Sequence, residues 1–313
     1  MSVDGILIVN KPPGLTSFSV VSRLRRASGE KRVGHAGTLD PDATGVLVVC
    51  FGQGTRMVEF LSGARKTYRS TIRLGTITDT LDAAGRVIES RDFSHITRKQ
   101  AEMVIDTFKG PIEQVPPMYS AIRIEGKRLH TLAREGIDIP RKARKVHIYG
   151  IEMLEWHPPD VTLQVECSAG TYIRSLASDI GGLLGCGAHV HHLVRLRSEP
   201  FDIAGAVPLL EALQVFVQGD WRRMVQAIDV ALLDHDAFLL GKDNEAMVAN
   251  GRRIYLPVQE QEDATSKLCR AYSTDGRLLA VLRREEKDLW HPEKVFSSSL
   301  LEEHIIESCQ AGS

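Results

Sequence analysis

A glycine-rich loop that runs directly into an apolar strand constrains this chain more than any other feature. The loop reads Gly34-His35-Ala36-Gly37-Thr38-Leu39-Asp40-Pro41-Asp42-Ala43-Thr44-Gly45, and the apolar run Val46–Phe51 follows it. An uninterrupted apolar run between glycines is typical of a strand buried on both faces. Glycine lets a ligand approach the backbone closely, and the proline after Asp40 holds that residue extended. The pattern indicates a catalytic loop, although a surface turn capped by Asp40 explains the same residues.

The rest of the first 200 residues predicts interleaved strands and helices. Strands are expected at Gly5–Asn10, Tyr68–Leu74 and Val161–Cys167, where apolar residues run together or alternate. Helices are expected after Ser17, which we assign as the cap, over Arg98–Phe108, and from Ile173 onward. Several neighbouring strands are spaced as hairpins. The pattern therefore predicts an α+β fold with a mixed, mainly antiparallel central sheet.

The length and a change in composition predict a second domain. A chain of 313 residues exceeds what one core usually fills. Phe201–Leu233 is helical in pattern, and short strands with an Asp275-Gly276 turn follow it. We expect a first domain over residues 1–233 and a small C-terminal β-barrel over residues 234–313.

Several classes of protein are disfavoured by motifs that the chain lacks. Its five cysteines are widely spaced without a C-x-x-C pair, which favours a reducing, cytoplasmic compartment. Neither a signal peptide nor an apolar run of membrane-spanning length occurs. The sequence also lacks a P-loop and a complete dinucleotide fingerprint. His189, His191 and His192 leave a metal hydrolase open as an alternative, which metal analysis of the protein would test.

Three further stretches could contact an anion or a nucleic acid. Arg174 lies near a helix start, where the helix dipole disfavours a cation, so it either pairs with an anion, a phosphate or a carboxylate, or is a solvated arginine. Tyr68, between Lys66 and Arg69, is either a core residue or a platform on which a base stacks. Tyr119 opens a segment rich in Lys and Arg, which suits phosphate contacts or a solvated face.

These motifs together resemble the TruB family of tRNA pseudouridine synthases. The resemblance covers about residues 5–200. It rests on motifs in the family's order: Lys11-Pro12 with Gly14 and Ser17, the Gly34–Gly45 loop, Lys66-Thr67-Tyr68, Pro116-Pro117-Met118-Tyr119-Ser120-Ala121 with Gly126-Lys127-Arg128-Leu129, Gly170-Thr171-Tyr172-Ile173-Arg174, and Gly187–Leu193 with Arg195-Leu196-Arg197. The C-terminal Asp275–Ala280 and Pro292–Val295 resemble an RNA-binding PUA domain.

The resemblance implies an activity, a substrate and a set of site residues. It implies isomerisation of uridine 55 in the TΨC stem-loop of tRNA to pseudouridine, by a monomer that uses no cofactor. Asp40 matches the family's catalytic carboxylate, Arg174 its arginine partner and Tyr68 the tyrosine that stacks on the target base. We expect pairing with Arg174 to lower the pKa of Asp40. The residues expected to contact substrate are His35, Tyr172, Leu193, Lys11, Tyr119, Lys127 and Arg128.

Two alternatives on the same fold remain beside this one: a non-catalytic RNA chaperone, and a relative that depends on a guide RNA. The intact set of Asp40, Tyr68 and Arg174 argues against the first. The resemblance also implies that residues 1–233 are the catalytic domain, with an RNA-gripping insertion at about 115–147. That insertion argues against the second alternative, since guide-dependent relatives lack it. The formal net charge of −1 hides an asymmetry, because residues 1–75 hold 11 Lys and Arg against 5 Asp and Glu, whereas residues 195–313 hold 14 against 20. That asymmetry favours RNA binding by the N-terminal part.

Overall fold

The apolar run after the glycine-rich loop forms strand β3 (Thr44–Phe51), in the interior of a ten-stranded mixed sheet. In the computed structural model the strands follow the order β14 (Val207–Pro208), β1 (Gly5–Lys11), β3, β12 (Ala188–Ser198), β4 (Lys66–Leu74), β11 (Asp160–Cys167), β10 (Arg144–His157) and β7 (Gly110–Gln114). In addition, β2 (Val33–Ala36) pairs with β3, and β13 (Phe201–Asp202) pairs with β12. Parallel pairing joins β1 to β14 and β3 to β12, and the other pairings are antiparallel. The predicted mixed, mainly antiparallel sheet is confirmed.

The structure describes residues 3–120, 123–124, 127–134, 136–137, 139–257 and 267–296. The chain divides into two compact units, Met1–Val225 and Gln226–Ser313. The first unit ends a few residues before the boundary that we expected from composition. Within the described residues, none of the helices combines the length and apolar character needed to cross a membrane.

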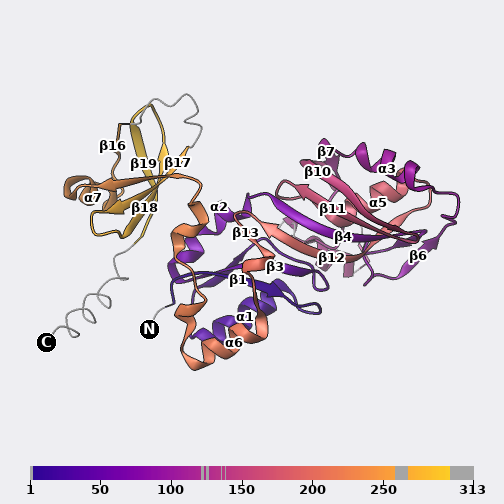
Figure 1. The fold of residues 1–313 in the computed structure, drawn as a ribbon, viewed down its shortest axis with the longest axis horizontal. Coiled ribbons are helices and arrows are strands. Elements are labelled where there is room, and N and C mark those ends of the chain that lie inside the picture. The colour runs from indigo at the N-terminus through magenta and orange to yellow at the C-terminus, as the bar shows by residue number, and fades with distance from the viewer. Residues whose placement is uncertain are drawn as a thin grey trace. The chain divides into compact units, whose positions relative to one another are not determined.

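Helices cover the sheet of the first unit at both ends (Figure 1). Near β1 lie α1 (Ser17–Ser28) and α6 (Leu209–Gln218), which pack on each other, and near β10 and β11 lie α3 (Arg98–Asp106) and α5 (Ile173–Leu183). Thr16, rather than the expected Ser17, caps α1 through a hydrogen bond from the Ser19 amide. Ser17 is instead buried, because its hydroxyl binds the catalytic loop at Leu39.

Shorter elements complete the first unit. They are η1 (Gly52–Met57), α2 (Val58–Ser62), β5 (Thr76–Thr78), β6 (Val87–Ser90), η2 (Ile203–Gly205) and η3 (Trp221–Arg223). The insertion between β7 and β10 contributes β8 (Arg123–Ile124), β9 (Lys127–Arg128) and α4 (Leu129–Arg134). The insertion therefore leaves the sheet at the end of its edge strand β7.

The second unit is a small β domain, as the short C-terminal strands predicted. After η4 (Ile228–Leu232), its five strands form one half-barrel sheet in the order β15 (Asp236–Leu240), β17 (Leu268–Ser273), β18 (Leu278–Arg284), β19 (Leu289–Val295) and β16 (Ile254–Tyr255). Helix α7 (Lys242–Ala249) packs against it through Val248. Leu240, Ala271, Leu282 and Trp290 fill the core of this unit. The fold class expected from the sequence is thus confirmed.

Gly45 closes the catalytic loop at a point where three strands meet. It faces Lys11 on β1 and Arg195 on β12, and its φ of +98° is a conformation that side chains rarely adopt. A Cβ atom at this position would meet the backbone carbonyl of Arg195 at a distance far below van der Waals contact. Glycine is therefore required at this position both for its backbone conformation and for the close approach of β12.

We predict that Gly45→Ala lowers the free energy of unfolding by about 3 kcal/mol, because strain and a backbone clash coincide. Gly182→Ala is the matched control, because nothing lies near its Cβ position on the exposed side of α5 and alanine favours a helix. Urea unfolding of both variants measures the difference. Equal stabilities would show that β12 does not constrain the loop.

Candidate active site

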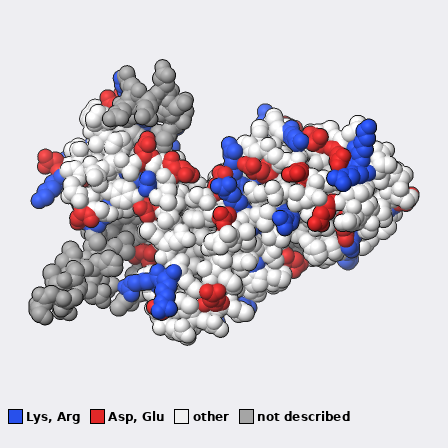
Figure 2. Space-filling view, in the orientation of Figure 1, with Lys and Arg blue, Asp and Glu red and all other residues white. Residues whose placement is uncertain are grey.

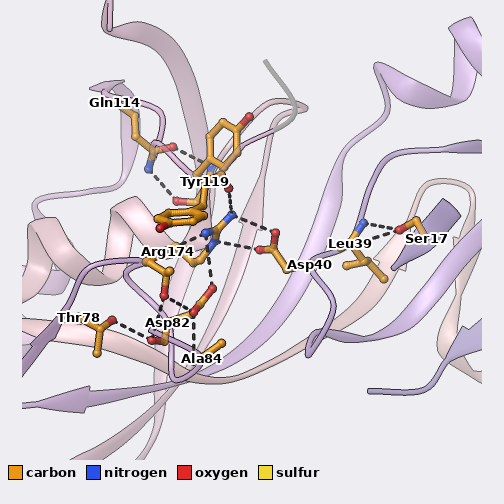
Figure 3. Close-up of polar contacts among 11 residues, drawn as sticks. Ser17, Leu39, Asp40, Thr78, Asp82, Ala84, Gln114, Tyr119 and Arg174 are labelled. Carbon is orange, nitrogen blue, oxygen red and sulfur yellow. Dashed lines mark hydrogen bonds and ion pairs between the residues drawn. The ribbon is translucent and has the colours of Figure 1, made fainter. Parts of the chain in front are cut away.

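The loop between β2 and β3 presents Asp40 and is fixed on both sides of it. On the N-terminal side, the Ser17 hydroxyl accepts a hydrogen bond from the Leu39 amide at 2.9 Å and lies 3.2 Å from the Leu39 carbonyl (Figure 3). On the C-terminal side, the ammonium group of Lys11 donates to the Pro41 carbonyl at 2.7 Å. The main chain on either side of Asp40 is therefore held by residues of the N-terminal strand and helix.

Lys11 occupies a different place from the one we expected. Its side chain is fully buried, and Nζ donates to the carbonyls of Pro12, Leu15 and Pro41 at 2.7–2.8 Å. Burial lowers the pKa of Lys11 to about 8, so the amine is largely protonated at neutral pH and can supply all three hydrogens. We expected Lys11 to contact substrate, but its protons are already used inside the protein, and the residue instead holds the catalytic loop.

Arg174, in the first turn of α5, reaches Asp40 with two of its nitrogens. Nη2 donates to Oδ1 at 2.9 Å, and Nε lies 2.9 Å from Oδ2 (Figure 3). The Arg174 side chain is only 5% exposed, whereas that of Asp40 is 37% exposed. This two-point contact, a hydrogen bond to Oδ1 and an ion-pair contact to Oδ2, holds both carboxylate oxygens against the guanidinium group and leaves part of the carboxylate open to solvent. The sequence expectation that an anion faces Arg174 is met by Asp40.

Asp82 is a second carboxylate beside Arg174 that the sequence analysis did not single out. Its Oδ2 lies 3.5 Å from Nη1 of Arg174, which also donates to the Thr80 carbonyl at 3.1 Å. The preceding Leu81 has a φ of +62°, the one such non-glycine residue among those described, and this turn directs Asp82 toward the arginine. None of the motifs singled out in the sequence includes Asp82.

Burial raises the pKa of Asp40 above its usual value, which corrects the expected direction. The ion pair with Arg174 does lower the pKa, but the loss of hydration is the larger effect and the negative charge of Asp82 adds to it.

Tyr68 and Arg195 are cross-strand neighbours on β4 and β12, behind the catalytic loop. Arg195 is 1% exposed, and it donates from Nε to the Val46 carbonyl at 2.7 Å and from Nη2 to the Gly37 carbonyl at 3.0 Å. Burial raises the pKa of Tyr68, which keeps its hydroxyl protonated. Arg195 was not identified as a site residue from the sequence, because nothing in its motif distinguishes a buried arginine from an exposed one.

His35 is half-buried on β2, at the start of the same loop. Burial lowers its pKa, and the charge of Arg195 lowers it further. The imidazole is therefore neutral at physiological pH.

The remaining expected site residues are Tyr172, Leu193, Tyr119, Lys127 and Arg128. Tyr172, half-buried, immediately precedes α5, and Leu193, partly buried on β12 opposite Ser70, packs on the core. Tyr119 is joined to the site by its main chain, since its carbonyl accepts a hydrogen bond from Nη2 of Arg174 at 2.8 Å. Lys127 and Arg128 form β9, and their side chains lie outside the described part of the structure.

His189, His191 and His192, which made a metal hydrolase an alternative, all belong to strand β12. His189 is buried and its Nδ1 lies 2.9 Å from the Thr76 carbonyl, while its ring centroid is 6.3 Å from that of His191. In the described ranges, His, Cys, Asp and Glu side chains form no group of three or more that could hold a metal ion.

Comparison with known protein families gives matches over most of the chain. Residues 25–173 match the model of the TruB family pseudouridylate synthase N-terminal domain, and residues 174–239 match that of the tRNA pseudouridylate synthase B C-terminal domain. A curated protein named tRNA pseudouridine synthase B from Dehalococcoides mccartyi is 42% identical over 95% of this chain and 97% of its own length. The protein of the same name from Symbiobacterium thermophilum is 49% identical over 67% of this chain and 71% of its own length.

Solved structures with a similar fold include chains of two multi-component complexes. A crystal structure of a Cbf5-Nop10-Gar1 complex contains a chain with a TM-score of 0.71 and 27% identity, covering 94% of this chain and 85% of that one. An H/ACA RNP bound to a substrate RNA containing 2′-deoxyuridine contains one with a TM-score of 0.69 and 26% identity, with the same coverage.

We predict that Lys11→Met lowers the free energy of unfolding by about 3 kcal/mol, because three buried carbonyls lose a charged donor. The salt dependence of tRNA binding should stay unchanged, since Lys11 meets no phosphate. Lys31→Met, at an exposed position, is the control and should change stability by less than about 0.5 kcal/mol. A stable Lys11→Met protein with a shallower salt dependence would restore Lys11 to the RNA interface.

Proposed function

This chain belongs to the TruB family of pseudouridylate synthases, and from that premise we propose that it converts uridine 55 in the TΨC stem-loop of tRNA to pseudouridine. It is an isomerase that forms pseudouridine in tRNA, in keeping with the name its curated relatives share. The position of the uridine and the roles of individual residues are the parts that we add.

The proposed reaction needs no outside reagent. The N1–C1′ bond breaks, the uracil turns, and a new bond joins C5 to C1′. C5 then loses its proton and N1 carries one, so that product and substrate are isomers. The chemical demand on the protein is a carboxylate that assists departure of the base, together with a surface that holds the uracil while it is detached.

The observation that carries this proposal is the two-point contact between Asp40 and Arg174. A carboxylate fixed in one plane and partly exposed is oriented for attack or proton removal without further ordering. Three steps remain open to Asp40: attack at C1′, attack at C6, and removal of a proton from the sugar. In each of them the reacting species is the ionised carboxylate, which Arg174 favours by its charge.

The aromatic and apolar neighbours suit the binding of a flipped base. Tyr68 supplies a face on which the uracil stacks, and Tyr172 and Leu193 line the sides of its site. His35 enters the space that the flipped nucleotide leaves, and its neutral imidazole does so without adding charge. Extrusion of a base costs a few kcal/mol, which stacking on Tyr68 offsets in part.

RNA contacts outside the uracil site come from exposed basic residues and from the insertion. In Figure 2, Lys and Arg alternate with Asp and Glu over the visible face, without a broad field of one sign. The second half of α1 and its connection to β2 hold a denser group, whose exposed members are Arg23, Arg25, Arg26, Lys31 and Arg32. With Tyr119, Lys127 and Arg128 of the insertion, this group supplies phosphate contacts to one RNA arm.

The protein acts on tRNA as a monomer in this proposal. A non-catalytic RNA chaperone would not require a fixed Asp40–Arg174 pair. Guide-dependent action draws some support from the likeness to H/ACA structures. The curated relatives that match over nearly their whole length are, however, named for tRNA, and tRNA is therefore the substrate that we propose.

We predict that Asp40→Asn abolishes pseudouridine formation in an unmodified tRNA transcript, while tRNA affinity stays within about three-fold of the unsubstituted enzyme. The amide keeps the shape of the side chain but cannot act as nucleophile or base. Release of tritium from C5-labelled uridine gives the rate, and mapping of the product gives the position. Turnover by Asp40→Asn would remove Asp40 from the mechanism, and a product at another uridine would contradict the position.

A further inference from the structure

The position of Arg174 depends on how α5 begins. The helix starts at Ile173, directly after Tyr172, and the Tyr172 side chain makes no capping hydrogen bond to its first amides. Arg174 lies in this first turn, where the positive end of the helix dipole repels a guanidinium group. The start of α5 must therefore be held by a neighbouring element, so that Arg174 stays against Asp40.

Gln114, the last residue of β7, supplies that hold. Its Nε2 donates to the Tyr172 carbonyl at 3.0 Å, and its Oε1 accepts from the Tyr172 amide at 2.7 Å (Figure 3). The Tyr172 carbonyl also accepts the first helical hydrogen bond of α5, from the Leu176 amide at 3.1 Å. One side-chain amide thus binds both polar groups of the residue from which the helix starts.

The residues that follow Gln114 contact the same helix turn. The Val115 carbonyl accepts a hydrogen bond from the Ser175 hydroxyl at 2.8 Å, and the Tyr119 carbonyl accepts one from Arg174 itself. Gln114 and Ser175 are 2% and 4% exposed, so these hydrogen bonds are shielded from competing water. The short segment from Gln114 to Tyr119 therefore contacts the helix start through three of its residues, at the point where the insertion begins.

We propose that Gln114 is a positioning residue for catalysis, which fixes Arg174 against Asp40 by holding the start of α5. This inference rests on the proposed function, in which that pair carries the reaction. A side-chain amide suits the task because it offers a donor and an acceptor on one planar group, matching the carbonyl and amide of Tyr172. Gln114 touches no reacting atom in this scheme and acts through Arg174 alone.

The test replaces Gln114 with methionine, which has a similar length but makes neither hydrogen bond. We expect Gln114→Met to slow single-turnover pseudouridine formation about 30-fold, because a small misplacement of a catalytic group is costly. The tRNA dissociation constant should stay within about two-fold. Since Arg174 lowers the pKa of Asp40, a loosened Arg174 lets that pKa rise, and the acidic limb of the pH–rate profile should move to higher pH.

Gln100→Met is the matched control. Gln100 also holds a helix start, accepting a hydrogen bond from the Thr97 amide at 2.8 Å, but it is exposed and belongs to α3. Its replacement should leave the rate, the affinity and the pH profile unchanged. Gln114→Glu keeps the length of the side chain and, when protonated, still offers one donor and one acceptor, so it should fold if methionine does not. When ionised it loses the donor and turns a negative charge toward the Tyr172 carbonyl, so turnover should slow by about 10-fold.

The outcomes separate this inference from the proposed function. If Asp40→Asn is inactive while both Gln114 variants turn over at the unsubstituted rate, only the inference fails. The inference is also overturned if a Gln114 variant is slower but the acidic limb of its pH–rate profile has not moved, or if its tRNA affinity has fallen in proportion to its rate. Either pattern marks general damage to the fold. Full activity of Asp40→Asn would overturn the proposed function and this inference with it.

Discussion

The site depends on one buried guanidinium group. Arg174 is 5% exposed, and burial of a cation is costly unless charges and hydrogen bonds compensate it. The compensation comes from Asp40, Asp82 and the carbonyls of Thr80 and Tyr119, which belong to three separate connections between strands. A single side chain thus brings the catalytic loop, the turn after β5 and the entry to the insertion to one point.

The opposite side of the catalytic loop is held in the same manner. Lys11, Ser17 and Arg195 are buried and bind main-chain groups of the loop and of β3, while Arg174 binds the carboxylate of Asp40. Lys11 and Arg195 are both cationic, and both donate their hydrogen bonds to backbone carbonyls. The loop is therefore fixed before any RNA binds, which is the condition for a carboxylate that must act without reorganisation.

Local patterns in the sequence were sufficient for β1, β3, β4 and β11, for the main helices and for the loop that carries Asp40, but they did not predict β7, β10 and β12. They were not sufficient for Asp82, Arg195 and Gln114, because the partner of a buried polar side chain is chosen by tertiary packing that no periodicity encodes. The charge count had the same limit. It included Lys11 and Lys66 among the cations available to RNA, but both are buried and donate to backbone carbonyls.

The most direct test of the role of the Asp40–Arg174 contact is single-turnover pseudouridine formation by Arg174→Lys. Lysine keeps the positive charge but cannot make the two-point contact that fixes the plane of the Asp40 carboxylate. If that geometry carries the reaction, the rate should fall at least about 100-fold while tRNA affinity stays within about three-fold. A rate close to that of the unsubstituted enzyme would show that charge alone is enough, and would contradict a central role for the two-point contact.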